Sequence, residues 1–265
     1  MTSFYDLTWE TSNSLSCFIT GSNCFANNST RGANYLAKYN FLKQDLVKTS
    51  EIIYRDNPQL KKFKNKKILV LGAGPTTNWY DWNPDEYDYI FSCNHFFLNE
   101  KLSKCKVDLV LICDEVDLQG DKFLDYVTKN NTLVGFEDYN KSSDNVRILN
   151  DKIPNNVFDC VLRFQGKIGV APKLINLAIL FGAEEVHFAG VDGHSKNYKK
   201  GESEDHAFQK DKKITTGYAY ELIEKHYECL KKYIQTEIGK NVIVKNLGEG
   251  HEQNVYSKIP DFKIE

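Results

Sequence analysis

The sequence lacks long hydrophobic runs and an excess of charge of either sign. No stretch approaches the about 18 consecutive apolar residues of a membrane-spanning helix, and the first residues are acidic where a secretion signal would be basic. With 34 basic and 36 acidic residues the net charge is −2, so no global basic field points to nucleic acid. We expect a cytoplasmic chain with no transmembrane segment and no nucleic-acid partner. A peripheral membrane contact is compatible with this composition.

Closely spaced cysteine pairs, internal repeats and low-complexity linkers are also missing. The seven cysteines include no CxxC pair, and one of them must stay unpaired. This pattern fits reduced thiols in a cytosolic protein better than a disulfide framework or a zinc site. No DxD-like pair stands at a strand end. We expect no resident metal.

What is present is an ordinary globular composition, with 41% apolar and 26% charged residues. Residues 1–64 are predicted to form an N-terminal extension, irregular over 1–33 and helical over 34–55. Residues 65–265 form the main domain, in which short apolar strands alternate with helices. The expected strands are 68–71, 89–93, 107–113, 132–136, 160–164, 185–189 and 241–244.

Two helices are predicted in the main domain, over 170–181 with Gly182 as its C-cap, and over 216–234. Alternating strands and helices indicate an α/β, Rossmann-like fold with a largely parallel sheet covered by helices on both faces. Ligands of such sheets bind beyond the carboxyl ends of the strands. Polar or small residues stand at five predicted strand ends: 72–76, 93–95, 113–115, 166–169 and 190–194.

The first of these ends, Gly72-Ala73-Gly74-Pro75-Thr76, is a glycine-rich turn directly after a strand. Glycines there allow backbone N–H groups to approach a phosphate or ribose, and Pro75 fits the first turn of a helix. The third glycine of a dinucleotide fingerprint is missing, and the second strand ends in Asn94 where an acid is required. The turn therefore predicts either a mononucleotide site or only a tight strand-to-helix connection.

A polar, lysine-rich segment over about 193–214 is predicted to be a lid. It holds His194 and His206, each a candidate general base or acid and each equally readable as a solvated loop histidine. His187 is interpreted as a core or sheet-face residue, and His95 as packing near the site. Asp114 and Asp192, at strand ends, are expected to find a hydroxyl or ammonium partner.

The order GAGPT, CNHFF, LICDE and GVAPKLINLAILFGAEEVHFAGVDGH resembles a bacterial group that includes the family 42 sialyltransferases and the DUF115-type motility-accessory proteins. The likeness covers roughly residues 65–262. It implies a variant of the GT-A glycosyltransferase fold. Departures from the group's pattern are Ala73 inside the turn, Ile168 in place of Ser or Thr, and no arginine nearer than Arg163.

The resemblance also implies roles for individual residues. Asp192 would lie at the sugar or ribose. His194 and Tyr198 would stand where tyrosines stabilise the departing phosphate, and His206 would be the lid base. The expected nucleotide-binding set is Gly72, Ala73, Gly74, Pro75, Thr76, Asn94, Asp114, Gly169 and Asp192.

The expected function is that of a glycosyltransferase that moves an activated acidic sugar, such as a CMP-linked nonulosonate, to a glycan or protein acceptor, in a homo-oligomer and without a required cofactor. One alternative is a Mg²⁺-dependent pyrophosphokinase or other phosphotransferase, for which Asp114 and Glu115 become central. A second is a nucleotide-binding subunit without catalysis. A dehydrogenase is a more distant alternative.

Overall fold

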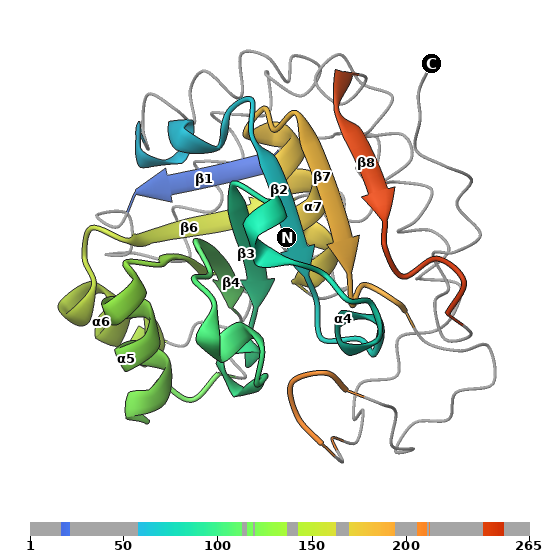
Figure 1. The fold of residues 1–265 in the computed structure, drawn as a ribbon. Coiled ribbons are helices and arrows are strands. Elements are labelled where there is room, and N and C mark those ends of the chain that lie inside the picture. Colours follow the sequence, from blue (N-terminus) through green and yellow to red (C-terminus); the bar gives the residue numbers. More distant parts are fainter. Residues whose placement is uncertain are drawn as a thin grey trace, which may run out of the picture.

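The computed structural model describes residues 17–21, 58–112, 116–118, 120–136, 143–162, 170–193, 206–210, 212 and 241–251. Their centre is one eight-stranded sheet in the order β1-β6-β5-β4-β3-β2-β7-β8 (Figure 1). Every neighbouring pair from β6 to β8 is parallel, and β1 alone is antiparallel. The strands are β1 (Cys17–Gly21), β2 (Lys67–Leu71), β3 (Tyr89–Cys93), β4 (Leu109–Ile112), β5 (Leu133–Phe136), β6 (Val157–Leu162), β7 (Glu185–Ala189) and β8 (Ile243–Asn246).

The central strands are continuous apolar runs because both faces of the sheet are covered. Ile68 to Leu71 of β2 and the whole of β4 are fully buried, which is typical of parallel sheets. The core continues through the aromatic side chains of Phe63, Phe91 and Phe181, which pack against one another.

Helices connect the parallel strands. The α-helices are α4 (Thr76–Trp79), α5 (Asp121–Asn130), α6 (Ser143–Lys152) and α7 (Ala171–Leu180). Short 3-10 helices are η2 (Pro58–Phe63), η3 (Pro84–Glu86), η4 (Phe96–Leu98) and η5 (Leu102–Lys104). Helices α5 and α6 lie on one face of the sheet, and α7, which packs on β2, β3 and β7, lies on the other, while α4 lies beyond the carboxyl end of β2 (Figure 1).

The predicted α/β architecture is confirmed, with some shifts in boundaries. All seven predicted strands exist, although β6 begins three residues earlier than expected. The helix predicted over 170–181 is α7, and Gly182 follows it with a φ of 70°. The antiparallel strand β1 was not predicted, since residues 1–33 were expected to be irregular. The helices expected over 34–55 and 216–234 lie outside the described residues.

The direction of the strand order reverses between β2 and β7. From β2 the chain adds β3, β4, β5 and β6 on one side, and it then returns to place β7 and β8 on the other. Ligands of open parallel sheets bind at the carboxyl edge next to such a switch point. In the part of the chain that the structure describes, no helix has the length and apolarity to cross a membrane.

Candidate functional site

The carboxyl ends of β2 and β7 are joined by a buried set of hydrogen bonds. The Asp192 carboxylate accepts from the Thr76 hydroxyl at 2.6 Å and from the Thr76 N–H at 3.0 Å. The Thr76 hydroxyl in turn accepts the Gly190 N–H at 2.7 Å. The Thr77 hydroxyl donates to the Gly72 carbonyl at 2.7 Å. We call Gly72, Gly74, Thr76, Thr77, Gly190 and Asp192 the β2–β7 clasp.

The glycines of the clasp are required by close packing. A Cβ on Gly72 would lie 2.2 Å from the Gly190 carbonyl oxygen, and one on Gly74 would lie 2.3 Å from Asp192 Oδ2. Gly190 has a φ of 70°, and a Cβ there would lie 2.1 Å from the Thr77 hydroxyl oxygen. These distances leave no room for a side chain, so the glycine spacing of the turn follows from its contact with the end of β7.

This packing changes the roles expected for two glycines. The N–H groups of Gly72 and Gly74 were expected to approach a ligand. They instead donate at 2.8 Å to the carbonyls of Ala189 and Gly190, respectively. Asp192 has the hydroxyl partner that was expected, and the Thr76 side chain supplies it. Pro75 precedes α4 as predicted, but a helix of four residues offers little dipole to an anion.

Three backbone N–H groups at the same two strand ends have no acceptor among the residues that the structure describes. They belong to Ala73, Val191 and Gly193. Val191 is 3% exposed, and buried backbone N–H groups without a partner are rare in folded proteins. Although these three N–H groups are not consecutive in the chain, backbone N–H groups gathered at strand ends can bind an anion.

Part of the predicted lid lies on this turn. We call residues 206–210 the docked segment. The Ala207 N–H donates to the Ala73 carbonyl at 2.8 Å, and Ala207 and Phe208 are buried. His206, the residue before Ala207, therefore lies close to the turn.

His206 is held as a neutral imidazole whose Nε2 has no partner among the described residues. Its Nδ1 accepts the N–H groups of Phe208 at 3.2 Å and Gln209 at 3.1 Å, which leaves the proton on Nε2. Burial, with smaller contributions from the positive charges of Lys212 and His95, lowers the pKa of His206 to about 4. Its Nε2–H is thus available as a hydrogen-bond donor, and the ring is a weak base at neutral pH.

Other predicted residues lie at the same edge or outside the described residues. Asn94 follows β3 in the left-handed conformation, with a φ of 45°, and His95 comes next. Asp114, Gly169, His194 and Tyr198 are outside the described residues.

His187 lies in β7 and half-buried on the sheet, as predicted, where its Nδ1 is 3.1 Å from the Tyr87 hydroxyl. Burial, with the nearby Lys67, lowers its pKa.

Sequence reasoning missed two amides, the buried Asn99 and the exposed Asn78. Asn99 Nδ2 donates to the Ala207 carbonyl at 2.9 Å and to Asn78 Oδ1 at 2.8 Å. Asn78 lies in α4 and Asn99 directly follows η4. Neither residue stands at a predicted strand end or in the predicted lid, the two places from which candidate site residues were chosen. Both belong to the floor beneath the docked segment.

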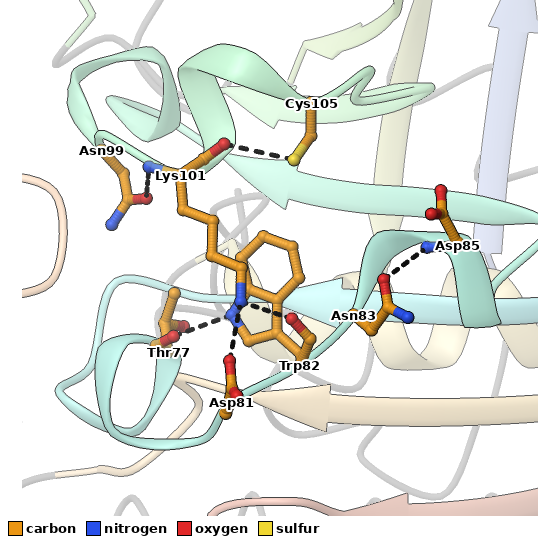
Figure 2. Close-up of polar contacts among 8 residues, drawn as sticks. All are labelled: Thr77, Asp81, Trp82, Asn83, Asp85, Asn99, Lys101 and Cys105. Atoms are coloured by element: carbon orange, nitrogen blue, oxygen red, sulfur yellow. Dashed lines mark hydrogen bonds and ion pairs between the residues drawn. The ribbon is translucent and has the colours of Figure 1, made fainter.

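Two residues after Asn99, a lysine stacks on a tryptophan (Figure 2). The Lys101 ammonium lies 4.1 Å from the ring centre of Trp82, donates to the Trp82 carbonyl and pairs with Asp81 at 3.3 Å. The Trp82 indole N–H donates to the Thr77 carbonyl at 2.9 Å. These contacts fix the chain after α4 against η5.

No group of three or more metal-binding side chains occurs within the described ranges. Comparison with known proteins finds neither a family model nor a curated protein that matches the chain.

Proposed function

We propose that the chain is a glycosyltransferase of the GT-A-variant type that binds a CMP-linked acidic sugar at the switch point between β2 and β7. The observation that carries the proposal is that the N–H groups of Ala73, Val191 and Gly193, at the two strand ends joined by the clasp, have no acceptor among the described residues. Backbone N–H groups at this edge of a parallel sheet suit a phosphate. The cytoplasmic location, the homo-oligomer and the glycan or protein acceptor belong to the same proposal.

The clasp residues act as the support of this pocket. Gly72, Gly74, Thr76 and Asp192 bond to one another or to β7 and hold the strand ends in place. Ala73 supplies an N–H that has no acceptor in the described part of the chain. Asn94, at the adjacent strand end, is the candidate for the ribose or base. Asp114 and Gly169 remain predicted contacts outside the described residues.

The proposed reaction is a direct displacement at the anomeric carbon. The acceptor hydroxyl oxygen bonds to that carbon while the bond from carbon to the phosphate oxygen breaks, and the electron pair leaves with CMP. His206 offers its Nε2–H to the departing phosphate, since its low pKa makes it a poor proton acceptor. His194 then takes the acceptor proton, and Tyr198 is a second donor to the phosphate.

A thermal-shift panel of CMP, UDP, GDP, ADP and NAD tests the nucleotide. A ligand at a hundred times its Kd adds about 2.7 kcal/mol, which for a chain of this size raises Tm by about 5–10 °C. We expect CMP to produce this shift and NAD to produce none. A shift with another nucleotide and none with CMP contradicts the assignment.

Transfer from a CMP-linked nonulosonate, assayed with and without a chelator, tests the chemistry. His194→Gln is expected to lower kcat by about 10²–10⁴-fold, and His206→Gln by less. Because CMP leaves with a single phosphate, the reaction should resist the chelator. Loss of activity with the chelator supports a Mg²⁺-dependent phosphotransferase instead, and CMP binding without transfer supports a non-catalytic subunit.

A further inference from the structure

Within the described residues, the docked segment is attached to the rest of the structure by a small number of polar contacts. One is the bond from the Ala207 N–H to the Ala73 carbonyl. The others meet at the Ala207 carbonyl, which accepts from Asn99 Nδ2 at 2.9 Å and, at 3.4 Å, from Asn78 Nδ2. Asn99 makes the shorter and stronger of these two bonds.

Asn99 holds this position because both ends of its amide are fixed. Its side-chain oxygen accepts the N–H groups of Lys101 and Leu102, each at 3.0 Å, at the start of η5. Figure 2 shows the bond with Lys101. The Asn99 side-chain nitrogen also donates to Asn78 Oδ1 at 2.8 Å. With 5% of its surface exposed, Asn99 has four protein partners and no freedom to turn.

We propose that Asn99 is a positioning residue that holds the docked segment, and with it His206, against the Ala73 turn. The proposal rests on the function proposed above, since it assigns His206 to the departing phosphate. Asn99 itself lies behind the segment and acts on the reaction only through it. A displacement of about 1 Å in a catalytic group can lower a rate about a hundredfold.

Asn99→Asp separates the two ends of the side chain. A carboxylate keeps an oxygen for the N–H groups of Lys101 and Leu102, but it cannot donate to the Ala207 carbonyl or to Asn78. Asn83→Asp is the matched control, because Asn83 also caps a 3-10 helix through its side-chain oxygen, is exposed and does not contact the docked segment (Figure 2). Urea denaturation confirms that both variants fold. If Asn99→Asp does not fold, Asn99→Ser replaces it, because serine also keeps an oxygen that can accept a hydrogen bond.

The readout independent of activity is the NMR titration of His206. The groups that face this ring are His95, beyond β3, and Lys212, next to the docked segment itself. In the wild type we expect a pKa near 4, because the segment buries the ring. In Asn99→Asp it should move toward the ordinary value of about 6.5, and trypsin should cleave after Lys210 at least about tenfold faster. Asn83→Asp should match the wild type in both measurements.

In the transfer assay Asn99→Asp should lower kcat by about tenfold to a hundredfold, with the KM for the acceptor changed far less. Unchanged His206 titration and proteolysis in both Asn99 variants overturn the proposal, as does an equal change in Asn83→Asp. If Asn99→Asp frees the segment while the wild type transfers no sugar from any donor, the positioning of His206 stands and the proposed function fails.

Discussion

At the scale of single residues, Gly74 has no side chain because a carboxylate occupies that space. A Cβ would lie 2.3 Å from Asp192 Oδ2 and 3.0 Å from the Gly190 carbonyl oxygen. Gly74→Ala must push Asp192 away from the Thr76 N–H and leave a buried charge with fewer partners. We expect a loss of about 2–4 kcal/mol in the free energy of unfolding, measured in urea.

Gly120→Ala is the control for that substitution. The nearest atom to a Cβ at Gly120 is 3.6 Å away, which is ordinary contact, and its φ is −77°. The free energy of unfolding of Gly120→Ala should fall by less than about 1 kcal/mol, which is the usual effect of a change at a helix N-cap. Equal losses at the two glycines would mean that the clasp is not what requires Gly74.

Asn176 is a second residue with an unusual environment. It is fully buried in α7, and neither atom of its amide group has a hydrogen-bond partner among the residues that the structure describes. An amide buried without partners costs about 1–3 kcal/mol. Asn176→Leu, similar in size, should therefore raise the free energy of unfolding by about 1–2 kcal/mol. Destabilisation by this substitution, with a comparable loss in Asn176→Ala, would show that the amide has a partner such as bound water.

At the scale of elements, the docked segment should respond to pH. His206 has a pKa of about 4 when the segment is docked and about 6.5 when it is released. The released state binds more protons between these values, so docking is fully favoured above about pH 6.5 and weakens as the pH falls toward 4.

Hydrogen exchange of residues 206–210, corrected for intrinsic rates, measures this change. We expect about tenfold more opening at pH 5 than at pH 7, after allowance for the partial exposure of the ring. His206→Gln should remove the difference, since glutamine does not titrate in this range. Equal protection at the two pH values in the wild type would contradict the account.

The strands and helix that the sequence predicted well are those that are buried on every side. β2 and β4 are short apolar runs with both faces covered, and α7 is apolar on nearly every side. β1 was missed because its five residues gain their strand structure by pairing with β6, about 140 positions later in the chain, and local patterns carry no information about such a partner.

At the scale of the whole molecule, the sequence predicted that several polar strand ends share one edge, and the structure confirms this for residues 72–76, 94 and 190–193. The sequence alone could not show that polar groups of different strand ends form hydrogen bonds with one another. Thr76 and Asp192 are 116 positions apart, and their contact exists only because β7 returns to lie beside β2. Thr76 and Asp192, which were both predicted to bind the ligand, bond to each other. The N–H of Ala73 is the group of this turn that is left for a ligand, and an alanine side chain gives no indication of such a role in the sequence.

The central claim is that a nucleotide phosphate binds at the switch point, and the backbone amide spectrum tests it most directly. In a ¹H–¹⁵N NMR titration with CMP, we predict saturable shifts that are largest at the N–H groups of Ala73, Val191 and Gly193, which have no acceptor within the described residues. Saturable shifts confined to other residues, such as those around Tyr87, which precedes the amino end of β3, would contradict it.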